Sequence, residues 1–172
     1  MIDEAKHPEL AEPIHEDAHL EGLDERFLAA LGLRRQGDVD GCADELREIL
    51  KVEPRLAEPH LELANLLLDL RRHEEARAHA EEAVRLLESG DPWLADPPPH
   101  VLRSLAWGVL GESLRVAADS DEVVFGEPER FVALMAQARS AFSKAAALDA
   151  SNEHAVHWSL HLKDPSPGGG SR

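Results

Sequence analysis

Histidines are the side chains in this sequence whose type and spacing first suggest chemistry, and there are ten of them. His154, His157 and His161 stand three and four residues apart, so one helical face would carry all three. Histidine pairs one helical turn apart can bind zinc, but of the acidic side chains only Glu153 lies at ligand spacing. Three ligands along one helix also converge on one tetrahedral ion only under strain. We therefore expect a polar helix face with Trp158 packed inward, and zinc binding is the alternative.

The other reactive side chains lack the partners that catalysis needs. The single cysteine, Cys42, stands at a small-residue position of a predicted helix, which favours a buried spacer over a nucleophile. The cluster His15–His19 lies in an acidic segment that we expect to be loosely ordered. The carboxylate pairs Glu74–Glu75 and Glu81–Glu82 have arginines one turn away, at Arg72, Arg77 and Arg85. Because no glycine-rich phosphate loop or GxSxG turn is present, we predict neither an enzyme nor a bound cofactor.

Helices are the elements that would position these side chains. In Ala57–Glu88, two sets of apolar or small residues recur at helical spacing. They are Leu63, Ala64 and Leu67, and then Ala76, Ala80 and Ala83. The connector Asp69–Arg72 is short enough to require antiparallel neighbours. Two such helices cannot bury a core alone, so the pattern predicts further hairpins.

The same pattern occurs 34 residues earlier, from Leu23, and again in a split copy. The earlier copy places Gly37 in the turn and Pro54 just after the second helix. The split copy comprises Pro99–Leu114 and Phe131–Leu148, with an acidic insertion between them. These matches, including LELANLL, HEEA and ILKVEP, resemble the tetratricopeptide repeat, whose period is 34 residues. One departure is Arg71, which stands where that family usually has glycine.

The predicted fold is all-α: a tetratricopeptide-like right-handed α-solenoid of antiparallel helix pairs, with about seven helices. An acidic N-terminal arm would span 1–18 and a disordered tail 163–172. Between them, the helical domain 19–162 comprises repeat one at 23–56, repeat two at 57–90, a linker at 91–98, repeat three with its insertion at 99–150, and a capping helix at 152–162. We expect Trp93 and Leu94, in the linker, to fold back onto the helices.

The resemblance implies a concave groove lined by the first helix of each repeat. At its groove positions stand Phe27, Leu31, Arg34, Leu61, Asn65, Leu68, Arg103, Trp107 and Leu110. Such a mixture of apolar residues with a few polar ones is typical of a groove for a peptide or helix. Trp107 beside Arg103 is the predicted anchor, because tryptophan and arginine dominate interface energetics. The alternative is that the linker, the insertion or the arm covers this groove within the same molecule.

Composition and charge narrow the class of partner. A formal net charge of −16 disfavours binding to nucleic acid or an anionic membrane, because contacts with their phosphates need a basic patch. No stretch is long and apolar enough for a membrane span, and the N-terminus does not read as a signal peptide, so we expect a cytoplasmic protein. We predict a protein-interaction module, adaptor or cochaperone-like, for a protein or peptide with a basic or apolar segment.

Two other assignments belong to the binding class, and a third is structural. Cochaperones of this family grip acidic tails with a basic clamp, but Phe27 and Leu31 stand at the clamp positions of repeat one. The alternatives are a homo-oligomeric scaffold and a small cytosolic chaperone that holds a secretion substrate.

Overall fold

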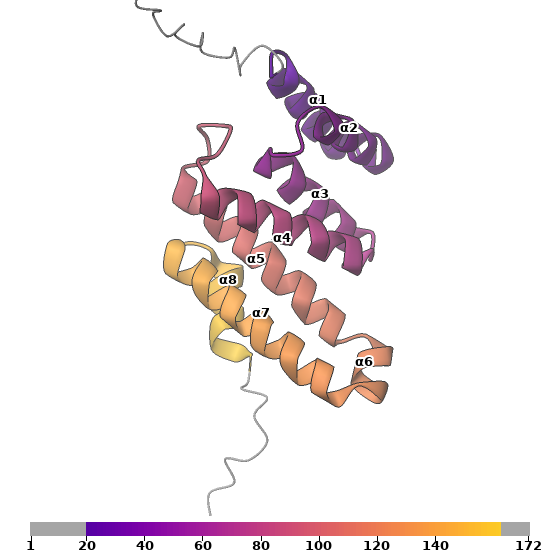
Figure 1. Ribbon diagram of the computed structural model, residues 1–172, viewed down its shortest axis with the longest axis vertical. Coiled ribbons are helices and arrows are strands. Elements are labelled where there is room, and N and C mark those ends of the chain that lie inside the picture. Colours follow the sequence, from indigo (N-terminus) through magenta and orange to yellow (C-terminus); the bar gives the residue numbers. More distant parts are fainter. Residues whose placement is uncertain (1–19, 163–172) are drawn as a thin grey trace, which may run out of the picture.

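The computed structural model describes residues 20–162, and these residues form helices and turns without a β-strand (Figure 1). The helices are α1 (Leu23–Arg35), α2 (Val39–Val52), α3 (Ala57–Asp69), α4 (His73–Ser89), α5 (Pro99–Ala118), α6 (Asp121–Gly126), α7 (Pro128–Leu148) and α8 (Glu153–His161). The predicted all-α, solenoid-like class is confirmed. The described part of the chain has eight helices rather than about seven, because part of the predicted insertion forms the short α6. The predicted arm 1–18 and tail 163–172 lie outside the described residues.

The first two hairpins repeat with a period of 34 residues. Helices α1 and α3 are both 13 residues long, and they begin 34 residues apart. Each is followed by a residue in the left-handed region, Gly37 with φ 86° and Arg71 with φ 60°. In both turns the next amide donates to the carbonyl five residues earlier, from Asp38 at 3.0 Å and from Arg72 at 2.8 Å. This bond satisfies a carbonyl at the helix end, as in the Schellman motif.

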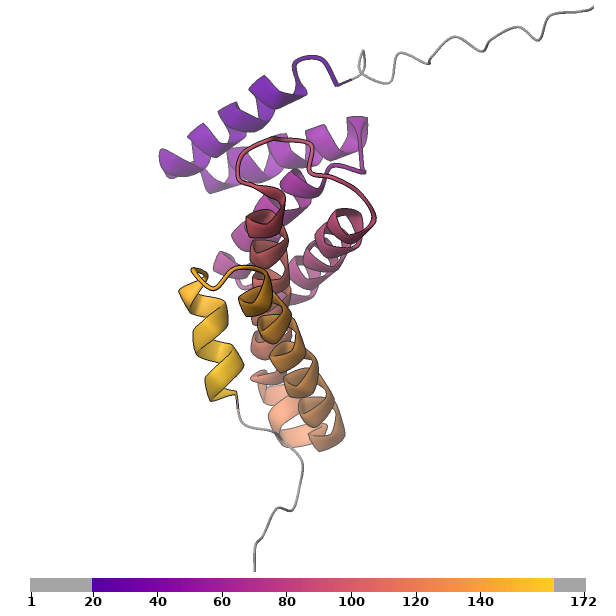
Figure 2. The same ribbon diagram turned by 90° about the vertical axis from the view of Figure 1, so that its left-hand side faces the viewer.

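The helices pack mainly against their neighbours in sequence. Contacts join α1 to α2, α2 to α3, α3 to α4 and α4 to α5. Helices α5 and α7 form a longer third hairpin with α6 at its tip, and α8 packs on α7 (Figures 1 and 2). Gly111 allows α5 and α7 to approach closely, since a Cβ there would lie 3.0 Å from the fully buried Phe142 ring.

Helix α3 is shared by two hydrophobic clusters. Its buried Leu63, Leu66 and Leu67 belong to a cluster with α1 and α2. Its Leu61 and Ala64 belong to a second cluster with α4, α5, α7 and α8. A helix that is apolar on both sides is typical of the interior of a stacked array, where each hairpin covers the next.

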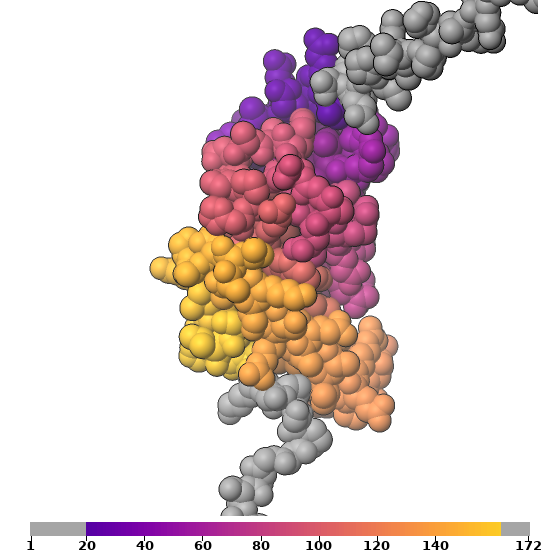
Figure 3. Space-filling model, turned by 60° about the vertical axis from the view of Figure 1, so that its left-hand side comes forward, coloured from indigo at the N-terminus to yellow at the C-terminus, as the bar shows by residue number. Residues whose placement is uncertain are grey.

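Residues 91–98, here called the strap, form the loop between α4 and α5 (Figures 2 and 3). Trp93 and Leu94 pack against the first hydrophobic cluster, which confirms the expectation that they fold back. The Trp93 ring meets Phe27 of α1 edge-on, with ring centroids 6.0 Å apart. The backbone N–H of Leu94 donates to the Glu58 carboxylate of α3 at 2.8 Å.

Candidate binding groove

The strap fills the part of the predicted groove that belongs to the first repeat. Phe27 is buried beneath Trp93, and Leu31 packs against the same cluster while partly exposed. Leu61 and Leu110 are also buried, in the second cluster. Burial therefore removes Phe27 and Leu61 from the predicted contact surface, whereas Leu110 still borders a hollow. The physical reason is that the strap and the neighbouring helices cover the apolar positions that the repeat pattern places toward a partner.

Arg34 joins the first helices of the first two hairpins instead of facing an empty groove. Its guanidinium, on α1, lies 3.0 Å from the carboxylates of both Glu62 and Asp69 on α3. The Glu62 pair is half-buried, and there burial raises the pKa of Glu62 even though the Arg34 charge opposes that change. Arg34 is thus committed to an intramolecular ion pair.

Trp107 and Arg103 also have partners within the chain. The Trp107 indole N–H donates to Glu88 at 3.0 Å, and the Lys144 ammonium lies 4.1 Å from its ring centroid. The Arg103 guanidinium donates to the carbonyl of Leu87 at 2.8 Å, near the end of α4. Trp107 is therefore held between a carboxylate and a cation.

Helix α5 separates the remaining predicted residues into two hollows. Trp107 and Leu110 line one of about 210 Å³ toward α4 and α7. Asn65 and Leu68 line another of about 210 Å³, between α3, α5 and the start of α8. The α5 residues of the two hollows lie on opposite sides of that helix, at 3.6 residues per turn. The structure thus does not bring Asn65 and Trp107 together.

The hollow between α3, α5 and α8 is hereafter called the groove. Its lining is formed by Asn65, Leu68, Leu105, Gly108, Val109, Glu112, Asn152 and His154. Leu105 is 42% exposed and Val109 is partly buried, and neither is among the groove residues predicted from the sequence. The predicted third repeat is counted from Pro99. If it is counted from Val101 instead, then Leu105, Val109 and Glu112 stand at the repeat positions that face the groove. The clue in the sequence was the prolines before α5, which displace this helix from the 34-residue period.

One polar group in the groove has no partner among the described residues, and the others are held in place. The Asn65 side-chain amide makes no hydrogen bond within 20–162. Asn152 caps α8 by accepting the amide of Ala155 at 3.1 Å, and it donates to the Ser104 hydroxyl of α5 at 3.0 Å. This network fixes the α8 wall of the groove, while Asn65 keeps one amide donor group and one carbonyl acceptor for a ligand.

Glu112 supplies negative charge to the groove. Arg115 donates to both of its oxygens, at 3.0 and 2.7 Å, and His154 Nε2 lies 3.5 Å from one of them. Burial acts to raise the Glu112 pKa, but the hydrogen bonds and charge of Arg115 outweigh it, so the pKa is lowered. Glu112 is therefore a carboxylate at neutral pH.

The three α8 histidines do not converge. His154 contacts the Phe142 ring edge-on, whereas His157 and His161 stack with ring centroids 4.3 Å apart. Within residues 20–162, no three histidine, cysteine or acidic side chains gather where they could hold a metal ion. Trp158 packs against the second hydrophobic cluster, as predicted.

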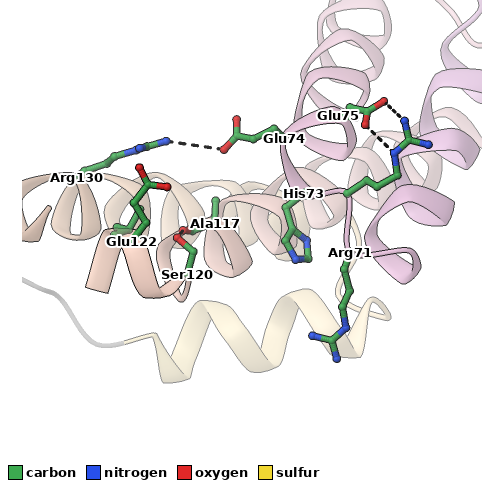
Figure 4. Close-up of a pocket in the computed structure, with 10 residues that line it drawn as sticks. Arg71, His73, Glu74, Glu75, Ala117, Ser120, Glu122 and Arg130 are labelled. Carbon is green, nitrogen blue, oxygen red and sulfur yellow. Dashed lines mark hydrogen bonds and ion pairs between the residues drawn. The ribbon is translucent and has the colours of Figure 1, made fainter. Parts of the chain in front are cut away.

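A third hollow, of about 350 Å³, was not predicted from the sequence (Figure 4). It lies between the start of α4 and the α5–α7 tip, and Arg72, Glu74, Glu75 and Arg130 are among its lining residues. Arg72 pairs with Glu75 at 2.6 Å, and Arg130 lies 3.8 Å from Glu74. The predicted pairing of these carboxylates with arginines one turn away is confirmed by Arg72–Glu75 and by Arg77–Glu74 at 3.2 Å, while the Arg130–Glu74 contact was not predicted. The three arginines and three glutamates that line the hollow leave it with balanced charge.

Comparison with known proteins returned no relative: no family model matches the chain, and a search of curated proteins found no match. Among residues 20–162, none of the helices combines the length and the apolar character needed to cross a membrane.

Proposed function

We propose that this protein is a protein-interaction module that holds an extended segment of a partner in the groove between α3, α5 and α8. The observation that carries the proposal is the unpartnered Asn65 amide beside the apolar side chains of Leu68, Leu105 and Val109. A side-chain amide can pair with the N–H and C=O of a peptide backbone, while apolar neighbours accept one side chain.

The 34-residue period of the first two hairpins supports a tetratricopeptide-like array as the scaffold for this module. In that arrangement α3, α5 and α8 are the first helices of successive units, and the groove lies where they meet. Helices stacked in this way hold the walls of the groove in fixed positions before a partner arrives, which reduces the entropy lost on binding.

The chemistry of the groove indicates the kind of segment it takes. An aliphatic side chain suits the Leu105 and Val109 surface, and a lysine or arginine next to it would reach Glu112. The net charge of −16 attracts a basic segment and disfavours an acidic one. The proposed ligand is therefore an extended peptide that carries an aliphatic residue close to a basic residue.

Selection from a displayed library of random peptides tests the proposal. The full chain is the bait, beside Asn65→Ala, Leu105→Asp and the control Phe125→Asp. Phe125 is 84% exposed on α6 and does not line the groove, so its variant alters an exposed apolar surface elsewhere. We expect selected peptides to lose at least about tenfold in affinity with either groove variant and to keep it with the control. Peptides that bind all three variants equally would refute the groove as the binding site.

A homo-oligomeric scaffold is the second candidate, and the α6–α7 tip favours it. Phe125 is the most exposed large apolar side chain among the described residues, and Val124 and Val132 nearby are also exposed. Exposed apolar clusters of this kind occur at protein interfaces. Light scattering of the wild type against Phe125→Asp decides this point: a dimer that the substitution dissociates supports the scaffold, and a monomer at high concentration excludes it.

A further inference from the structure

Two histidines on facing helices form a direct contact that the proposed function does not use. His60 lies on α3 and His79 on α4, and their Nδ1 atoms are 2.8 Å apart. The ring centroids lie 5.1 Å apart, so the two nitrogens meet head-on rather than side by side. Two nitrogens at this distance form a hydrogen bond when one carries a proton and the other offers its lone pair.

The backbone fixes which nitrogen donates. His60 Nε2 lies 2.9 Å from the carbonyl oxygen of Pro54, and a carbonyl only accepts, so His60 Nε2 carries a hydrogen. In neutral His60, Nδ1 therefore offers its lone pair, and His79 Nδ1–H is the donor. The Nε2 atom of His79 is then the basic nitrogen that can take the next proton.

The groups that face the pair make positive charge costly there. Burial lowers the pKa of His60, and it lowers the pKa of His79 to about 4, with the His60 charge contributing next. Arg85 of α4 faces His60 and Arg47 of α2 faces His79, and both arginines lower these pKa values. The carboxylates of Glu82, toward His60, and Glu75, toward His79, act in the opposite direction, but arginines hold both.

We propose that the His60–His79 hydrogen bond is an acid-operated latch between α3 and α4. The neutral pair carries two N–H protons, and a third proton binds at His79 Nε2 without breaking the hydrogen bond. A fourth proton places N–H against N–H across the 2.8 Å contact, so the two rings must separate. The latch is therefore closed with up to three protons and open with four, and the second hairpin loosens in acid.

The sign of the pH dependence follows from the lowered pKa values. In the unfolded chain both histidines charge near pH 6.5, whereas in the fold they stay neutral to lower pH. The unfolded state thus binds more protons below about pH 6.5, and stability falls as the pH falls. Each such histidine raises the unfolding equilibrium constant by up to about tenfold per pH unit in this range.

The first test is nitrogen NMR of the imidazole rings in the full wild-type chain. At pH 7 we expect the Nε2–H form for His60 and the Nδ1–H form for His79. We also expect that His79 is uncharged at pH 6 and that His60 titrates at a lower pH than an exposed histidine, which is mostly charged at pH 6. Two rings in the same tautomer, or normal titration near pH 6.5, would overturn the proposal, and this readout needs no substitution.

The second test compares the pH dependence of unfolding in the wild type, His79→Gln and the control His100→Gln. A glutamine at position 79 can still donate a hydrogen bond to His60, but it does not titrate. The control removes a histidine that is exposed on α5, His100. Between pH 6 and pH 5, the unfolding constant of the wild type and of the control should rise up to about tenfold more than that of His79→Gln. Equal pH dependence in all three proteins would overturn the latch.

Discussion

The backbone N–H of Leu94 donates a 2.8 Å hydrogen bond to the side chain of Glu58, which lies 36 residues earlier in the chain. The Glu58 carboxylate is buried at 4% exposure, and its second oxygen has no hydrogen-bond partner among the described residues. A buried carboxylate is costly unless its oxygens are satisfied. The strap is therefore held by a hydrogen bond to a buried carboxylate that has a partner for only one of its two oxygens.

This contact gives the first prediction. Glu58→Ala leaves the Leu94 amide without its acceptor and should lower the free energy of unfolding by about 1–3 kcal/mol. Glu58→Gln keeps an acceptor oxygen and removes the buried charge, so it should change stability by less than about 1 kcal/mol. Urea unfolding of both variants measures the difference, and equal losses would show that the charge, not the acceptor, holds the strap.

The second prediction concerns the two glycines of α5. Gly111→Ala places a methyl group 3.0 Å from the Phe142 ring and should destabilise the fold by about 1–3 kcal/mol. Gly108→Ala is the matched control, since its Cβ meets only the Asn152 amide at an ordinary 3.5 Å. That variant should be neutral or gain up to about 1 kcal/mol of helix propensity. Thermal unfolding of the pair tests this, and a Gly111 variant as stable as wild type would contradict the close packing of α5 on α7.

The third prediction uses the two equivalent turns. Arg71 has φ 60° where Gly37 has φ 86°, and the left-handed region is strained for a residue with a Cβ. Arg71→Gly should therefore raise the free energy of unfolding by up to about 1 kcal/mol, and Gly37→Arg should lower it by a similar amount. Opposite shifts in the urea midpoint are expected, and shifts of the same sign would mean that the two turns are not equivalent.

The fourth prediction concerns Cys42, whose side chain is fully buried between α1 and α2. Burial raises the pKa of its thiol, so little of the reactive thiolate forms at neutral pH. An aromatic disulfide reagent should label the native protein only as fast as the fold opens, and should label it at once in urea. Rapid labelling of the native chain at pH 7 would show that the thiol is accessible.

Much of the fold could be predicted from local features. Helix α2 lies where the sequence predicted it, because Gly37 precedes it and Glu53–Pro54 ends it. The small residues at Ala76, Ala80 and Ala83 indicated close helix packing, and all three are fully buried. Helix α6 was missed because its six residues, Asp121–Gly126, are too few to show a helical period of their own.

The groove was only partly predictable, because it depends on how distant segments pack. Asn65 and Leu68 line it, but Phe27 lies under a strap that no repeat pattern describes. Leu105 and Val109 of α5 also line the groove, although neither was among the groove residues predicted from the repeat pattern. The His60–His79 contact joins residues 19 positions apart on separate helices, which periodicity along one helix cannot reveal.

The strap has a consequence for cooperativity. In a linear array each unit is coupled only to the next, so the ends can melt before the middle. Here the strap follows α4 but rests on α1 and α3, so peeling away the first hairpin must also uncover Trp93, which packs on Phe27 of α1. The Leu94–Glu58 bond in turn ties the strap to α3 of the second hairpin. Because of this coupling, the first hairpin should unfold together with its neighbours. Thermal unfolding of the array should therefore show a single transition.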